Sequence, residues 1–232
     1  MREISTELES FLKKMGTKKI KGVVFDMDGL IFDSERVVQR SWNYAGKHLG
    51  FGEDFGNHIY NTIGFNAMKR KLYFEQNVDP AFPMEEFQSA TRAYFHQVKD
   101  TEGVPLKLGA KELMTYAKNK GYKVAVATSS SRKYAVDMLT QAGIYDLLDA
   151  CVCGDMVEHG KPHPEIYLRA CEAIGLYPIE CIALEDSPAG IQSAHKAGLK
   201  TIMIPDLVEP TEETKNIVDF IYENLLQVID II

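Results

Sequence analysis

The order of apolar and polar positions predicts a chain in which short buried strands alternate with helices. From about residue 109 onward, each brief apolar run is followed by a turn and by a segment whose apolar residues have helical spacing. The helical segments stop near glycines, which favour the left-handed conformation at a helix end: Gly121, Gly143, Gly175 and Gly198. The apolar runs themselves are YKVAVATSS, ACVCG, CIALEDS and KTIMIP.

Near-continuous apolar strands of this kind are typical of a parallel sheet covered by helices on both faces. We therefore predict an α/β fold with a Rossmann-like parallel sheet. An earlier apolar run, KGVVF, provides its first strand. In such sheets, ligands bind beyond the carboxyl ends of the strands.

The segment 36–103 has a different pattern, with Trp42, further aromatic residues and helical periodicity but no strong strand signal. It follows the first strand directly and ends where Gly103 and Pro105 break any helix. We predict a small helical cap domain over residues 36–103, hinged over the carboxyl edge of the sheet. Residues 1–35 and 104–232 then form the α/β core domain.

The first residues place apolar side chains at helical spacing, at Ile4, Leu8, Phe11, Leu12 and Met15. We interpret this segment as a short helix docked on the body of the protein. A helix that binds a partner or a membrane surface is the alternative.

Composition narrows the classes of function. The chain has 232 residues, is 45% hydrophobic and carries a formal net charge of −7, so it has no basic surface to attract nucleic acid or an anionic membrane. No stretch approaches the roughly 20 apolar residues of a membrane span, and the N-terminus lacks the apolar centre of a signal peptide.

We expect a cytoplasmic monomer whose partner is a small molecule. The four cysteines form no C-x-x-C pair and are expected to be reduced thiols rather than metal ligands.

Polar clusters follow three of the predicted strands. They contain Asp26 and Asp28 after the first strand, Thr128, Ser129 and Ser130 after the second, and Glu185, Asp186 and Ser187 after a later one. Because the carboxyl ends of parallel strands meet at one edge of a sheet, these side chains are expected to converge.

Two other interpretations of Asp26 and Asp28 are weaker. A calcium loop beginning at Asp26 fails, because Leu30 and Val37 stand where oxygen ligands belong. A surface turn explains an isolated D-x-D, but it does not explain acids at a second strand end. Converging carboxylates repel one another and need a cation between them.

Oxygen ligands without nearby histidine or cysteine suit Mg²⁺, which often completes its coordination with a substrate phosphate. The phosphate itself can be bound by the Thr128 hydroxyl, by backbone N–H groups around Ser129 at a helix N-terminus, and by Lys161 in the turn HGKPHPEIY. His163 in the same turn is expected to be a loop residue, with a place at the substrate's edge as the alternative.

Four motifs in this order, DMDGLIFDSE, ATSSSR, GKPHPEIY and ALEDSPAGI, resemble those of the haloacid dehalogenase superfamily. The similarity covers the chain from about Lys21 onward. It is greatest to the branch of β-phosphoglucomutase and small sugar phosphatases.

The resemblance implies a role for each matching residue. Asp26 is the nucleophile and Asp28 the general acid and base, and Thr128 and Lys161 hold the phosphate. Asp26, the Asp28 backbone carbonyl and Asp186 bind Mg²⁺, with Glu185 acting through water or behind the direct ligands. Members that cleave carbon–halogen bonds generally lack an aspartate at the Asp28 position, so its presence implies phosphate-ester chemistry.

We therefore predict a Mg²⁺-dependent phosphatase of small phosphorylated metabolites, sugar phosphates among them, that works through an aspartyl-phosphate. A phosphosugar mutase is the alternative within the enzyme class, and a non-catalytic sensor of phosphometabolites is the alternative outside it. The mutase has a cap histidine at the position of Val38 and a cap arginine at the position of Asn66. Their absence from this chain favours hydrolysis.

Overall fold

The structure is a computed structural model that describes residues 19–62 and 67–232. The predicted N-terminal helix and Asn66 therefore lie outside the described residues. The chain forms two units, Met1–Phe32 together with Leu106–Ile232, and Asp33–Pro105. The segment expected to be a cap, residues 36–103, falls inside the second unit.

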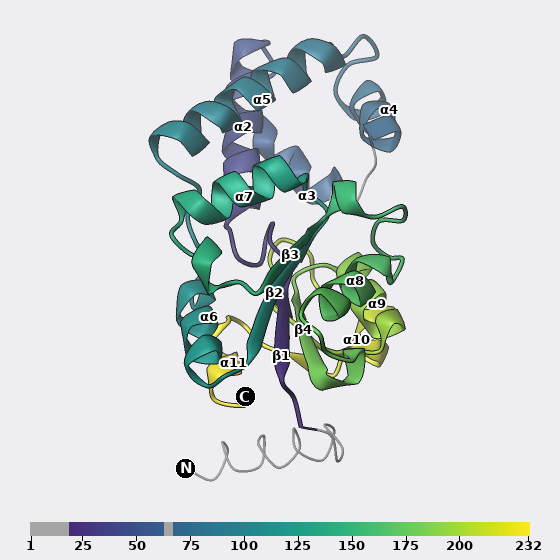
Figure 1. Cartoon of the computed structure of the whole chain (residues 1–232). Coiled ribbons are helices and arrows are strands. Elements are labelled where there is room, and N and C mark those ends of the chain that lie inside the picture. The colour runs from purple at the N-terminus through teal and green to yellow at the C-terminus, as the bar shows by residue number, and fades with distance from the viewer. Residues whose placement is uncertain (1–18, 63–66) are drawn as a thin grey trace. The chain divides into compact units, whose positions relative to one another are not determined.

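The first unit contains a parallel sheet, with six strands among the described residues in the order β3-β2-β1-β4-β5-β6 (Figure 1). The chain steps from β1 to β2 and β3 on one side, and then crosses to β4, β5 and β6 on the other. The strands are β1 (Gly22–Phe25), β2 (Lys123–Thr128), β3 (Ala150–Cys153), β4 (Cys181–Glu185), β5 (Lys200–Met203) and β6 (Phe220–Ile221). The predicted α/β parallel fold is thus confirmed, and each apolar run forms a strand. The two-residue strand β6 was not predicted.

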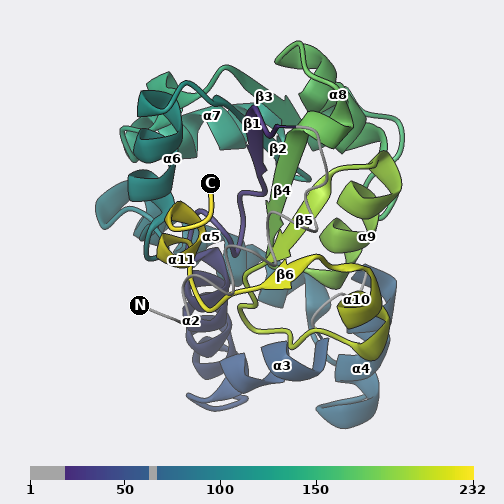
Figure 2. The same ribbon diagram turned by 90° about the horizontal axis from the view of Figure 1, so that it is seen from below.

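Helices cover both faces of this sheet (Figure 2). α8 and α9 pack together on one face, with α10 against α9, while α6 and α11 pack together on the other, and α7 lies next to β3. Their bounds are α6 (Ala110–Asn119), α7 (Arg132–Gln141), α8 (Glu165–Ala173), α9 (Pro188–Ala197), α10 (Glu212–Ile217) and α11 (Leu226–Ile229).

The central strand β1 is buried on both faces, which explains its uninterrupted apolar sequence. Val23, Val24 and Phe25 have no solvent-exposed surface. Burying each of these side chains contributes on the order of 1.5–3 kcal/mol. The strand is therefore fixed firmly, and so is the position of the residue that follows it.

The second unit is helical and has its own aromatic core. Its helices are α2 (Ser34–His48), α3 (Ile59–Thr62), α4 (Ala67–Asn77) and α5 (Met84–Thr101), and α2 packs along α5 (Figure 1). Trp42 from α2 makes edge-to-face contacts with Phe74 of α4 and Phe87 of α5, at centroid distances of 5.6 and 5.5 Å. Phe55 and Phe82 complete this buried cluster. Aromatic packing of this kind lets a segment of about seventy residues form a core without a sheet.

None of the described helices is long and apolar enough to cross a membrane. All four cysteines are free thiols, and Cys153, Cys171 and Cys181 are buried. Three of the four thiols therefore pack in the core, and Cys151 is partly buried.

The start of β3 is tied to its neighbours by Asp149. The carboxylate of Asp149 accepts hydrogen bonds from the backbone N–H of Val124, at 2.8 Å, and from the ammonium groups of Lys118 and Lys123, at 2.9 and 3.0 Å. Partial burial raises the pKa of Asp149, but these donors outweigh it and lower the pKa to about 2. The ionised form of Asp149 is therefore favoured by folding.

We expect Asp149→Asn to lower the free energy of unfolding at pH 7 by about 0.5–1 kcal/mol, the range for ion pairs near the surface. Because the folded pKa is depressed, the stabilisation is fully present above the unfolded pKa of about 4 and is lost as the pH falls towards 2. Urea unfolding at pH 7 and at pH 3 measures the difference. Asp146→Asn, at an exposed aspartate three residues away, is the control. A difference for Asp149→Asn that is as large at pH 3 as at pH 7 would contradict the assignment.

Candidate active site

The register of the sheet brings the predicted polar clusters together. Phe25, the last residue of β1, pairs with Val126 of β2 and Leu184 of β4. The next residue, Asp26, continues this register, because its N–H donates to the Leu184 carbonyl at 2.9 Å. Asp26 therefore lies level with Glu185 at the carboxyl edge of the sheet, at the point where the strand order reverses.

Lys161 connects Asp26 and Glu185. Its ammonium donates to Asp26 Oδ1, to Glu185 Oε1 at 2.6 Å and to the Ala127 carbonyl at 3.0 Å. Lys161 comes from the loop of residues 157–164 between β3 and α8, which we call the Lys161 loop. Only 7% of its side chain is exposed. The prediction that Lys161 is more than a solvated lysine is thus consistent with its position.

Burial sets the electrostatics of this cluster. It raises the pKa of Asp26 to about 8, since the cost of desolvating the carboxylate and the repulsion from Glu185 and Asp28 outweigh the attraction of Lys161. Burial lowers the pKa of Lys161, but the carboxylates of Asp26 and Glu185 overcome this and raise it above its usual value. Lys161 therefore stays positively charged. Its single charge does not balance the negative charge of the carboxylates around it.

Glu185 is fully buried and is held by two hydroxyl groups besides Lys161. The Tyr167 hydroxyl donates to Oε1 at 2.6 Å, and the Ser187 hydroxyl donates to Oε2 at 3.0 Å. Burial, together with the charges of Glu185 and Asp26, raises the pKa of Tyr167 well above its usual value, so the phenol remains a donor. The sequence analysis assigned no role to Tyr167. Its only signal was its place in the GKPHPEIY motif, six residues after Lys161.

Asp28 lies at the same edge but has a different partner. The Ser130 hydroxyl donates to Asp28 Oδ2 at 2.7 Å. Thr128, at the end of β2, is buried, and its hydroxyl accepts from the backbone N–H of Ser130 at 3.1 Å. Ser129, between them, is exposed. Helix α7 begins only at Arg132, with Ser131 as its N-cap, so Ser129 belongs to the turn before the helix rather than to its first residues.

Three carboxylates form a group that could bind a metal ion. Oxygen atoms of Asp26, Glu185 and Asp186 lie within 4.8 Å of one another. Asp186 packs over the backbone of Gly29, where a Cβ would stand 2.2 Å from Asp186 Oδ2 and where φ is +85°. Hard oxygen donors and an excess of negative charge over the single Lys161 ammonium fit Mg²⁺. Asp28, the fourth predicted metal residue, was expected to bind through its backbone carbonyl, and that part of the prediction is not tested by this group of side-chain carboxylates.

A protein-family model, haloacid dehalogenase-like hydrolase, matches residues 23–204, most of the described α/β unit and the whole helical unit. The chain belongs to this family. The predicted resemblance and the prediction of a hydrolase are thereby confirmed.

Several relatives match this hydrolase over most of their length. Hexitol phosphatase A of Escherichia coli K12 is 30% identical over 212 residues, which are 90% of this chain and 94% of the relative. A phosphorylated carbohydrates phosphatase of Thermotoga maritima is 28% identical, over 79% of this chain and 84% of its own. The crystal structure of CbbY from Rhodobacter sphaeroides in complex with phosphate superimposes with a TM-score of 0.69 at 26% identity, covering 90% of this chain and 96% of that one.

The hydrolase leaves no room for a side chain at Gly190, in the first turn of α9. A Cβ at this position would lie 1.9–2.0 Å from the carboxyl atoms of Glu185. We expect Gly190→Ala to displace this buried carboxylate and to lower the free energy of unfolding by roughly 1–3 kcal/mol, the usual cost of overpacking.

Urea unfolding measures this change. Gly160→Ala is the matched control, because a Cβ at Gly160 would meet nothing within 4 Å. Equal stability of the Gly190→Ala and Gly160→Ala proteins would show that Glu185 does not pack against α9 in this way.

Proposed function

We propose that this hydrolase is a magnesium-dependent phosphatase that cleaves phosphate esters of small metabolites, sugar phosphates among them. The observation that carries the proposal is the grouping of Asp26 with Lys161, Glu185 and Asp186 at the switch point of the parallel sheet. Two relatives named as phosphatases, one of hexitols and one of phosphorylated carbohydrates, support the substrate class.

In the proposed reaction, the Asp26 carboxylate attacks phosphorus and forms an aspartyl-phosphate. The bond between phosphorus and the ester oxygen breaks, and Asp28 gives its proton to that oxygen, which leaves as an alcohol. Asp28 then takes a proton from a water molecule that attacks the aspartyl-phosphate. Inorganic phosphate is released and the Asp26 carboxylate is regenerated.

The phosphoryl group needs donors for its oxygens during both steps. Lys161 provides a buried cation beside Asp26, and Thr128 provides a hydroxyl at the neighbouring strand end. We propose that these two groups, with the backbone N–H of Ser129, bind the phosphoryl oxygens. The hydrogen bond from Ser130 orients the Asp28 carboxyl for proton transfer.

Asp26, Asp186 and the backbone carbonyl of Asp28 are the proposed Mg²⁺ ligands, with Glu185 acting through water or behind the direct ligands. When bound, the ion offsets the negative charge of the phosphoryl group and of the carboxylates. Glu185 is fixed by Lys161, Tyr167 and Ser187. It therefore serves mainly to position Lys161 in this proposal.

We propose that residues 36–103 act as the cap that selects the substrate and excludes water. This unit has its own cavity of about 470 Å³, within the size range of small-molecule sites. Arg70, Thr91 and Trp42 are among its lining residues, and the Arg70 guanidinium lies 5.5 Å from the Trp42 ring centroid. A cation, a hydroxyl and an aromatic face suit a polar, anionic metabolite.

Hydrolysis is favoured over phosphosugar transfer by the cap's chemistry. A mutase must pass a proton and orient its intermediate in two directions, tasks that suit a proton-handling cap histidine and a cap arginine. Val38 lines the cap cavity and cannot transfer a proton. A non-catalytic sensor is disfavoured because the chain has both aspartates, the lysine and the acidic group that catalysis requires.

Asp26→Asn tests the nucleophile. The amide keeps the shape of the side chain but cannot attack phosphorus, so we expect Mg²⁺-dependent release of phosphate from an aryl phosphate to fall by at least about 10³-fold. Asp146→Asn carries the same chemical change at an exposed site and should keep the wild-type rate. A folded Asp26→Asn protein with near-normal turnover would rule out the mechanism.

Asp186→Ala tests the metal site. Because it removes one of few protein oxygen ligands, the Mg²⁺ concentration for half-maximal activity should rise at least about tenfold. Cys151→Ser and Cys153→Ser remove the thiols that could bind a metal instead. Both variants should leave the Mg²⁺ requirement unchanged. The reverse pattern would place the metal at the cysteines.

A further inference from the structure

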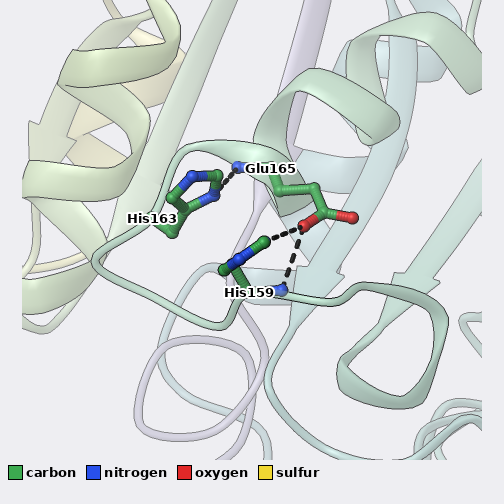
Figure 3. Close-up of side chains that lie close together, drawn as sticks. All are labelled: His159, His163 and Glu165. Atoms are coloured by element: carbon green, nitrogen blue, oxygen red, sulfur yellow. Dashed lines mark hydrogen bonds and ion pairs between the residues drawn. The ribbon is translucent and has the colours of Figure 1, made fainter.

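A second group of potential metal ligands lies on the Lys161 loop and at the start of α8 (Figure 3). It consists of His159, His163 and Glu165, whose candidate ligand atoms all lie within 4.8 Å of one another. The His159 ring faces the Glu165 carboxylate, and the His163 ring lies beside the Glu165 backbone N–H (Figure 3). The centroids of the two imidazole rings are 4.5 Å apart.

Glu165 is held in place independently of the two imidazoles. Its carboxylate accepts from the backbone N–H groups of Glu158, at 3.1 Å, and His159, at 3.0 Å. The Arg169 guanidinium adds an ion pair at 2.6 Å. These contacts hold the loop against α8. They also fix the position of the Glu165 carboxylate without any contribution from the imidazole rings.

The contacts of the two rings are longer than those that the backbone N–H groups make with Glu165. His159 Nδ1 is 3.2 Å from Glu165 Oε2, and His163 Nδ1 is 3.3 Å from the backbone nitrogen of Glu165. Two ligands about 2.0–2.1 Å from one tetrahedral ion are separated by about 3.3 Å. The 3.2 Å between His159 Nδ1 and Glu165 Oε2 is therefore compatible with two ligands of one ion as well as with a hydrogen bond. Both histidines are exposed, so an ion can reach them from solvent.

The ligand chemistry differs from that of the three-carboxylate group. Two imidazoles and one carboxylate suit borderline-soft ions such as Zn²⁺, Cu²⁺ and Ni²⁺, whereas Mg²⁺ prefers oxygen ligands only. We propose that His159, His163 and Glu165 form a binding site for a late first-row divalent cation, separate from the Mg²⁺ site.

An ion bound here joins three points of the chain. Two of its ligands flank Lys161 in sequence, and the third is the first residue of α8, the helix that also carries Tyr167. Binding therefore fastens the loop that supplies Lys161 to that helix. The protein with the ion bound should unfold at a higher temperature than the free protein.

Calorimetric titration with Zn²⁺, in the presence of excess Mg²⁺, tests the site. We expect His159→Ala and His163→Ala each to weaken Zn²⁺ binding at least tenfold, since each removes a direct ligand. His195→Ala, at an exposed histidine of α9, is the matched control and should bind as the wild type does. A loss smaller than tenfold in either His159→Ala or His163→Ala overturns the proposal, as does a wild-type protein that binds no Zn²⁺ under these conditions.

Electron paramagnetic resonance of the Cu²⁺-loaded protein provides an independent measurement. Couplings to two imidazole nitrogens should be present in the wild type and in His195→Ala, and absent from the double variant His159→Ala/His163→Ala. A spectrum that is the same in the wild type and the double variant would mean that Cu²⁺ occupies the carboxylate group instead, and it would overturn the proposal. Neither measurement depends on the phosphatase mechanism.

Discussion

The carboxyl edge of the sheet depends on one buried ammonium that pairs with two buried carboxylates. Lys161, Asp26 and Glu185 are each less than a tenth exposed at their side chains. Removing one partner of such a buried group leaves an uncompensated charge, which typically costs 3–5 kcal/mol. Charges are brought together in this way only where the surrounding structure supplies enough hydrogen bonds. The hydroxyls of Tyr167 and Ser187 and the Ala127 carbonyl provide them.

That arrangement follows from the parallel sheet. Because β1 is buried on both faces and pairs with β2 and β4 in one register, the residue after Phe25 has a single position. The change of direction in strand order at β1 opens the edge there, so that Asp26 and Asp28 meet side chains from two other strand ends. The crowding of side chains at this edge also explains two glycines. Gly29 and Gly190 leave the space into which Asp186 and Glu185 fit.

Those parts of the fold that depend on local apolar runs were predictable from the sequence, and those that depend on side-chain partners were not. The strands β1 to β5 and the grouping of their polar ends follow from runs such as KGVVF and CIALEDS. Strand β6 has only two residues and depends on pairing with β5, which no local pattern reveals. Tyr167 has the spacing of a core residue on α8, so only its contact with Glu185 distinguishes it. The backbone around Ser129 was expected to lie at a helix N-terminus, but α7 begins at Arg132 because the Ser131 side chain caps the helix.

The Lys161 loop carries residues next to two proposed metal sites of different chemistry. Lys161 contacts the group of carboxylate oxygens. That group contains no nitrogen donor, and nitrogen donors are what make Zn²⁺ and Cu²⁺ bind much more tightly than Mg²⁺. The nitrogen donors of the same loop, His159 and His163, project instead towards Glu165. If either imidazole joined the carboxylate group, the stronger intrinsic affinity of late transition metals would favour them over Mg²⁺. In the two proposed sites, the separation of oxygen and nitrogen donors favours a hard cation at the carboxylate group and a softer one at the histidines.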